Sequence, residues 1–194
     1  MVSKTRERFI EVARQLFARK GVENTTMNDI ASASEKGRRT IYTYFKSKRE
    51  IFNAVIASEA DQLLARLREI VAMEDSPRDK LVKYIDCRFD TMNEIVSRNG
   101  SLKAGFFRDV RKVDRARKLI TDKETALLRE ILEEGVSEGV FNIENMNHSA
   151  LVITHTIHGL DVPYIRDNLS KEGITQEQLK RYVTKLILNG IEKR

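Results

Sequence analysis

A short stretch in the N-terminal quarter of the chain is dense in side chains that can contact a polyanion. Arg38 and Arg39 stand next to each other, and Thr40 and Tyr42 follow within four positions. Guanidinium groups can bind guanine edges or phosphates, and Thr and Tyr hydroxyls can donate to phosphate oxygens. Lys48 adds a full charge where a further helix is expected to begin, and helix N-termini attract anions. This chemistry is typical of one helix entering a DNA major groove while its neighbours hold the backbone.

The surrounding sequence predicts the helices that would position these groups. Apolar spacing over residues 4–19 predicts a first helix. Thr26 is expected to cap a short second helix, because Asp29 follows three residues later as in a capping box. Gly37 is the expected N-cap of the third helix. Ser47 begins another S-x-x-E pattern and therefore a fourth helix. Two short helices joined by a tight turn form a helix–turn–helix.

The charge of the chain is distributed unevenly. Residues 1–50 contain 12 Lys and Arg against 6 Asp and Glu, so they account for the whole formal net charge of +6. A polyanion-binding module joined to an electrically neutral body explains this asymmetry. The alternative is that the basic runs are solvated helix faces.

Composition favours an all-α protein of about nine helices. There are 2 Pro and 9 Gly, and apolar residues recur at helical spacing. The single cysteine, Cys87, excludes an intramolecular disulfide within this sequence and fits a reducing compartment. We find neither the apolar core of a signal peptide nor an apolar run of the ~20 residues that a membrane span requires. We therefore expect a cytoplasmic protein that does not contact a membrane.

The body of the chain is expected to contain further helices separated by turn signals. Ser76 and Pro77 mark one helix start, and Thr175 with Gln178 marks the last. Pro163 is expected to kink or end the penultimate helix. The other expected features are a helix break at 99–101, helices over 102–110, 113–138 and 147–167, and turns at Gly135, Gly139 and Asn142.

The last two helices carry more apolar surface than one small body readily covers. Packing them against the same pair of a second subunit would form a four-helix interface and a homodimer. The alternative is that both helices pack within their own chain.

The N-terminal residues resemble the TetR family of bacterial transcriptional regulators. The resemblance covers about residues 4–52 and is carried by these segments: Ile10–Gly21, Thr25-Thr26-x-x-Asp29-Ile30-Ala31, Thr40-Ile41-Tyr42-x-Tyr44-Phe45 and Ser47-Lys48. It implies an N-terminal helix–turn–helix DNA-binding domain over 1–48. It also implies a C-terminal regulatory and dimerisation domain over 49–194 that senses a small-molecule effector.

The resemblance also suggests which residues contact double-stranded DNA. Thr26 and Lys48 match phosphate-contacting positions, and Thr40 and Tyr42 match contacts of the recognition helix. The candidate DNA-binding residues are Thr26, Gly37, Arg38, Arg39, Thr40, Tyr42, Tyr44 and Lys48. Of these, Tyr44 is expected to be at least half buried.

The turn departs from the family pattern. Ser34-Glu35-Lys36-Gly37 stands where the family usually has Ala-Gly-Val-Ser, and Arg39 stands where it usually has Gly. Glu35 near DNA would be mildly repulsive, whereas Arg38 and Arg39 add two long donors.

A ligand pocket is hypothesised among the helices of the body. The candidate lining residues are Phe89, Met92, Phe106, Phe107, His155 and His158. Ordinary core packing is the alternative for each of them. His155 and His158 lie three apart on one helix, but no third ligand has convincing spacing, so we expect no metal site and no cofactor.

Three functions compete. The leading one is a sequence-specific, ligand-responsive repressor that binds a palindromic operator as a homodimer. An enzyme is not expected, because the sequence has no nucleophile–base pair, Gly-rich phosphate loop or metal cluster. The third is a protein-binding module of the same fold that has lost specific DNA binding, which the altered turn would permit.

Overall fold

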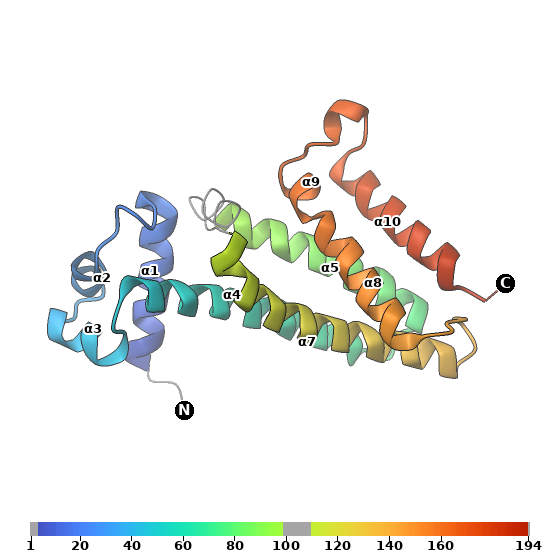
Figure 1. The fold of residues 1–194 in the computed structure, drawn as a ribbon, viewed down its shortest axis with the longest axis horizontal. Helices are drawn as coiled ribbons and strands as arrows, with labels where there is room; N and C mark the ends of the chain where they lie inside the picture. The colour runs from blue at the N-terminus through green and yellow to red at the C-terminus, as the bar shows by residue number, and fades with distance from the viewer. Residues whose placement is uncertain (1–3, 99–109, 194) are drawn as a thin grey trace. The chain divides into compact units, whose positions relative to one another are not determined.

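The computed structural model describes residues 4–98 and 110–193, and α-helices dominate it (Figure 1). This confirms the all-α fold expected from the sequence. None of the helices in these two ranges is both long enough and apolar enough to cross a membrane. The helices are α1 (Lys4–Lys20), α2 (Met27–Ala33), α3 (Arg38–Tyr44), α4 (Lys48–Val71), α5 (Pro77–Arg98), α7 (Val110–Ser137), α8 (Met146–Gly159), α9 (Asp161–Ile165) and α10 (Gln176–Ile191).

The chain divides into two compact units. The first comprises the described residues of Met1–Asp61 and Ile95–Arg117, and the second those of Gln62–Glu94 and Lys118–Arg194. By these bounds α4, α5 and α7 each continue from one unit into the other. The short helix expected over 102–110 falls almost wholly outside the described residues.

The first unit is built around the apolar stripe of α1. Its residues pack against α2, α3 and the start of α4 to form one hydrophobic cluster. Burial of several large side chains is the main force that holds such short helices in place, because helices of seven residues are unstable alone. The largest fully buried side chains of the cluster are Phe9, Phe17, Ile30, Ile41, Phe45 and Ile51.

Local capping chemistry sets several helix boundaries as the sequence predicted. The Ser76 hydroxyl accepts a hydrogen bond from the Asp79 N–H at 3.1 Å, directly before α5. At α10, Thr175 and Gln178 form both hydrogen bonds of a capping box. Asp167 and Gly173 have positive φ in the connection before that box.

The single helix predicted over 147–167 is wrong, because the chain forms two helices there. α8 ends at Gly159 and α9 begins at Asp161. Pro163 lies inside α9, and a proline ring clashes with the carbonyl four positions earlier, which here belongs to Gly159. The break therefore comes one turn before the proline and not at it.

Gly135 was predicted to form a turn but lies inside α7, which ends at Ser137. A Cβ atom at Gly135 would come within 2.1 Å of the Phe141 ring. The Gly135 carbonyl also accepts hydrogen bonds from the N–H groups of Val140 and Phe141. The glycine is required by this close approach. The turn itself is made at Gly139, where φ is +73°.

Candidate nucleic-acid interface

The start of α2 is fixed by two residues with different roles. The Thr26 hydroxyl accepts a hydrogen bond from the Asp29 N–H at 3.1 Å, and the Asp29 carboxylate accepts one from the Thr26 N–H at 2.9 Å. The hydrogen bonds from Thr26 lower the pKa of Asp29. Thr25 is fully buried and donates to the Gly21 carbonyl at 2.7 Å. This closes the loop that follows α1, and it leaves Thr26 exposed at the N-terminus of α2.

The non-standard turn between α2 and α3 is closed by hydrogen bonds from the N–H groups of Ser34, Glu35 and Lys36. The Ser34 N–H donates to Ile30 and the Lys36 N–H to Ala31, both at 3.0 Å. Glu35 adopts φ of +56°, a left-handed conformation that favours glycine. The Ser34 hydroxyl is buried and has no hydrogen-bond partner among the described residues. The turn therefore forms, but it holds one strained residue and one unsatisfied polar group.

The recognition helix predicted from the sequence is α3. Gly37 is its N-cap, with no side-chain hydrogen bond. Ile41 is completely buried and anchors the helix to the cluster of the first unit. Arg38 and Arg39 are both exposed in the first turn. One face of α3 is thus held by the core, while its N-terminal turn presents two guanidinium groups and free backbone N–H groups to solvent.

The two tyrosines of α3 differ in how far their side chains are buried. Tyr42 is 42% exposed, and the guanidinium carbon of Arg38 lies 5.9 Å from the centre of its ring. Tyr44 is largely buried, as predicted, and its ring lies 5.8 Å from that of Phe9. Thr40 is partly buried. Tyr42 therefore offers its hydroxyl to a ligand on the surface, whereas Tyr44 supports the helix from the core side.

Lys48 has a contact that the sequence analysis missed. Its Nζ donates to the carbonyl oxygens of Val22 and Glu23 at 2.6 and 3.1 Å. The lysine thereby joins the start of α4 to the loop that precedes α2. An ammonium group has three donors, so one remains for an external acceptor. Ser47 caps α4 as predicted, accepting from the Glu50 N–H at 3.2 Å.

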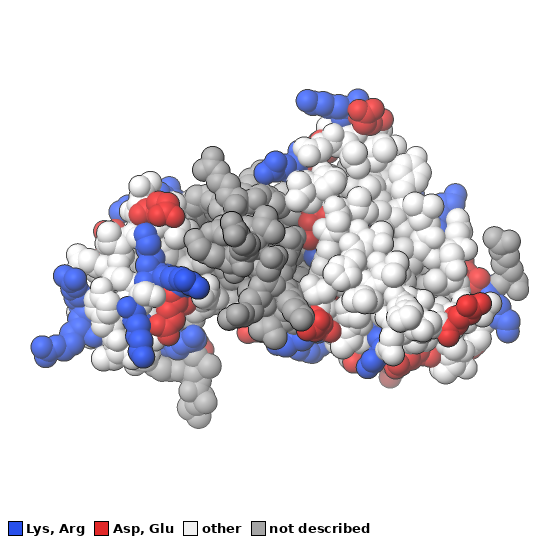
Figure 2. All heavy atoms as spheres, in the orientation of Figure 1, with Lys and Arg blue, Asp and Glu red and all other residues white. Residues whose placement is uncertain are grey.

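Basic side chains outnumber acidic ones around α2 and α3. Figure 2 shows this excess of Lys and Arg spheres over the two helices, at the left of the view. Among the described residues from the turn to the start of α4, the exposed cations are Lys36, Arg38, Arg39, Lys46 and Arg49. A surface of this sign attracts a polyanion and raises its local concentration.

The second unit buries a charged cluster that the sequence analysis did not identify. Arg88 of α5, 3% exposed, donates to Glu124 of α7 at 2.9 Å and makes two hydrogen bonds to Asp161 of α9. Nε2 of His158 lies 2.6 Å from the second Glu124 oxygen. Tyr84 donates to the Glu124 carbonyl at 2.9 Å. The signal in the sequence was a single arginine between Ile85 and Phe89 on an apolar helix face.

Electrostatics inside this cluster favour the charged forms. Burial opposes the charge of Arg88, but the carboxylates of Asp161 and Glu124 outweigh it and raise the pKa of Arg88. Burial likewise opposes the charge of Glu124, but Arg88 and His158 outweigh it and lower the pKa of Glu124. The ionised Arg88 and Glu124 therefore join α5 to α7, and hydrogen bonds to Asp161 and His158 add α9 and α8 to the cluster.

The predicted ligand-lining residues have different surroundings. Phe89 is fully buried, with its ring 4.9 Å from that of Tyr164, and Met92 is partly buried. His155 is exposed, whereas His158 belongs to the charged cluster. Among the side chains described by the structure, no group of three or more His, Cys, Asp or Glu residues could hold a metal ion. The remaining candidates, Phe106 and Phe107, lie outside the described residues.

Comparisons with known proteins match this geometry. The family model described as bacterial regulatory proteins, tetR family, matches residues 9–55, the segment that forms the first unit's helix–turn–helix. The HTH-type transcriptional repressor KstR2 of Mycolicibacterium smegmatis is 27% identical over 70% of this chain and 67% of its own length. The probable acrEF/envCD operon repressor of Escherichia coli is 48% identical over 26% of this chain, but the match spans less than a quarter of that protein, 23%.

A solved structure extends the likeness to the whole fold. The crystal structure of a transcriptional regulator from Cytophaga hutchinsonii superimposes with a TM-score of 0.77 and covers 96% of this chain and 98% of its own. Its sequence is 23% identical to this chain. The capped helix–turn–helix, the family model and the likeness of fold agree with one another. Residues 9–55 of this chain therefore form the DNA-binding helix–turn–helix of the TetR family of bacterial regulatory proteins.

Proposed function

We propose that this protein represses transcription by binding a palindromic operator as a homodimer, and that a small-molecule effector releases it. The observation that carries the proposal is the exposed N-terminal turn of α3, where Arg38, Arg39 and Tyr42 stand on a helix anchored by buried Ile41. Residues 1–48 would serve as the DNA-binding domain and residues 49–194 as the regulatory and dimerisation domain. Thr26, Gly37 and Lys48 would hold phosphates on either side of the recognition helix.

Dimerisation is supported by apolar side chains exposed on α8 and α10. Val152 of α8 is 63% exposed and Leu186 of α10 is 73% exposed. Both line a hollow of about 400 Å³ between the two helices. Exposed apolar surface of this kind is typical of a subunit interface. Two copies joined there would present two recognition helices for half-sites ~34 Å apart on DNA.

Two observations support the parts of the proposal that concern repression and effector release: the names of similar proteins, and the contacts within the second unit. Two similar proteins carry the name of repressor. In the second unit, the described candidates for ligand contact are Phe89, Met92, His155 and His158. Of these, His158 belongs to the buried cluster that joins four helices. An effector that binds one arrangement of these helices better than another would shift the population away from the DNA-competent form.

A protein-binding module that has lost specific DNA binding is the second candidate. The turn favours it, because Glu35 brings a negative charge close to the proposed DNA surface. Specific DNA binding is opposed by such a charge but supported by the two arginines that directly follow.

Selection of bound duplexes from a random pool at physiological salt decides between the two candidates. Enrichment of one palindromic site by the purified chain would support the proposal and would give the operator. If a folded sample enriches no sequence, specific DNA binding is lost and the second candidate replaces it. The same operator then serves to screen for compounds that release the protein.

A further inference from the structure

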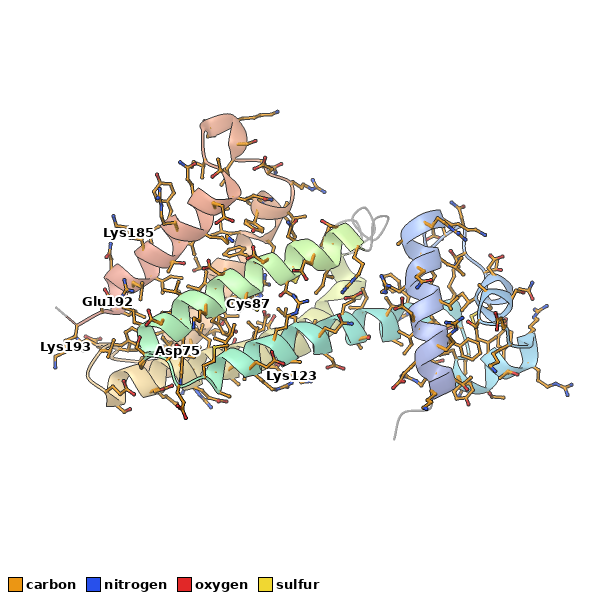
Figure 3. All side chains as sticks on the ribbon, turned by 180° about the vertical axis from the view of Figure 1, so that it is seen from behind. Asp75, Cys87, Lys123, Lys185, Glu192 and Lys193 are labelled. Atoms are coloured by element: carbon orange, nitrogen blue, oxygen red, sulfur yellow. The ribbon has the colours of Figure 1, made fainter. Side chains whose placement is uncertain are left out.

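A groove of about 700 Å³ lies between α5 and α10 in the second unit. It contains none of the residues predicted to line a ligand pocket. Figure 3 shows the side chains of α10 in this region, with Lys185 and Glu192 labelled. The groove is lined by Arg78, Val82, Asp86, Glu177, Gln178, Lys180, Arg181, Thr184, Lys185, Leu188, Asn189 and Glu192.

Ion pairs join the two helices at both ends of the groove. At one end, Nε of Arg78 lies 2.7 Å from Glu192. At the other end, Nζ of Lys180 lies 3.0 Å from Asp90 and 2.9 Å from Glu177. Lys180 is only 7% exposed, and burial opposes its charge, but Glu177 and Asp90 outweigh this and raise its pKa. The two helices therefore run antiparallel, with a fixed separation at each end.

The middle of the groove holds two acceptors that the protein itself does not use. Residues four apart share one helix face, so Asp86 lies on the α5 face that also carries Arg78 and Asp90. Among the side chains that the structure describes, Asp86 has no hydrogen-bond or ion-pair partner. Burial raises its pKa, Lys180 opposes the rise, and Asp90 and Glu177 add to it.

Thr184 of α10 is the second acceptor. It is 8% exposed, and its hydroxyl is buried without a hydrogen-bond partner in the described part of the chain. A buried hydroxyl without a partner destabilises a fold. The oxygen itself is covered by neighbouring atoms, so a bound molecule can supply the missing hydrogen bond only when the Thr184 side chain turns toward the groove.

α10 also carries two cationic side chains without an ion-pair partner among the described residues. Neither Arg181 nor Lys185 forms an ion pair with any residue that the structure describes, and both line the groove and are exposed. Val82 and Leu188 supply apolar wall. The groove is thus lined by a carboxylate and two cations that have no ion-pair partner among the described side chains, although the guanidinium carbon of Arg181 lies 5.7 Å from the centre of the Tyr182 ring.

We propose that this groove binds a small zwitterion, an organic acid that carries an amine. Its ammonium group would donate to the Asp86 carboxylate and, when the Thr184 side chain turns toward the groove, to the Thr184 hydroxyl. Its carboxylate would accept hydrogen bonds from Arg181 and Lys185. The proposal goes beyond the function proposed above, because binding here is measured without DNA and stands or falls independently of operator recognition.

Isothermal titration calorimetry with the full chain and linear ω-amino acids, from glycine to 6-aminohexanoate, tests the proposal. We expect one chain length to bind saturably with a Kd below about 1 mM. Asp86→Asn should weaken that binding by about tenfold or more. The matched control is Asp122→Asn, an exposed carboxylate on α7 outside the groove, which should bind like the wild type. The monofunctional amine and acid of the same length should each bind at least about tenfold more weakly.

Thr184→Val provides a separate readout. It removes the unpaired hydroxyl at nearly constant volume, so it should raise Tm without ligand by about 2–4 °C and weaken binding of the zwitterion. The proposal is overturned if no member of the series saturates below about 10 mM. It is also overturned if Asp86→Asn binds as the wild type does, if the simple amine binds equally well, or if Thr184→Val lowers Tm.

Discussion

Lys48 Nζ donates a hydrogen bond to the carbonyl oxygen of Val22, 26 residues earlier, at 2.6 Å. This contact joins the first turn of α4 to the loop between α1 and α2, and Glu23 shares the same ammonium at 3.1 Å. A residue that resembles a phosphate ligand in sequence therefore also positions the N-terminus of α2. A substitution here should affect both folding and DNA binding.

Lys48→Met should lower the free energy of unfolding by about 1–3 kcal/mol, because two carbonyls lose a charged donor. It should also weaken operator binding. Lys46→Met is the matched control, since Lys46 is exposed and its side chain has no such contact. The control should leave urea unfolding unchanged and only reduce the dependence of DNA affinity on salt. Equal stability of the two variants would show that the Lys48 contact contributes nothing.

Arg38→Ala and Arg39→Ala should each cost about 1–3 kcal/mol of binding free energy if the side chain reads a base. The guanidinium of Arg38 stands near the Tyr42 ring and Arg39 is exposed, so neither change should unfold the domain. Gel-shift titration against the selected operator and against random DNA separates base reading from phosphate contact. A loss that is equal on both DNAs would assign that arginine to the phosphates. Arg68→Ala on α4 is a suitable control.

The turn between α2 and α3 should become more stable when the family's usual residues are restored. Ser34→Ala removes a buried hydroxyl without a partner, and Glu35→Gly relieves a left-handed residue. Each should raise the free energy of unfolding by about 1 kcal/mol, as measured in urea. Glu35→Gln keeps the strain but removes the charge, so it should increase DNA affinity without stabilising the fold. Stabilisation by Glu35→Gln equal to that by Glu35→Gly would contradict the role of strain.

Glu124→Gln should destabilise the protein by about 3 kcal/mol at neutral pH, because Arg88 keeps its buried charge but loses one carboxylate partner. The folded state lowers the pKa of Glu124 below its usual value of about 4.5. Its contribution is therefore present above that value and is lost as the pH falls through the lower, folded-state pKa. Urea unfolding from pH 7 to 3 should show the difference between wild type and variant shrinking below about pH 4.5. Glu130→Gln, exposed on the same helix, should show no difference at any pH.

Leu186→Glu should separate the proposed homodimer into monomers. The side chain is 73% exposed in one chain, so a charge there harms the monomer little but would be buried unpaired in the interface. Sedimentation velocity on wild type and variant measures the change, and operator affinity should fall with it. The control is Val136→Glu, a 38% exposed position on α7. A wild type that sediments as a monomer at every concentration would exclude the dimer.

Much of the first unit could be predicted from the sequence because its signals are local. The capping box of Thr26 and Asp29, the N-cap at Gly37 and the serine before Lys48 each depend on residues within one helical turn. The charge asymmetry of residues 1–50 needs no coordinates at all. Residue type and spacing determine these features, so the helix–turn–helix and its exposed arginines can be predicted directly from them.

The side-chain contacts of the second unit depend on tertiary structure and could not be predicted from the sequence. Arg88 and Asp161 are 73 residues apart in the sequence. Asp86 and Thr184 likewise line one groove, although their helices lie far apart in the sequence. Periodicity shows that a residue faces inward, but the partner it meets depends on how the helices pack. The sequence thus determined the class of fold and the DNA-binding element, whereas the buried charges and unpaired acceptors emerged only when distant helices were brought together.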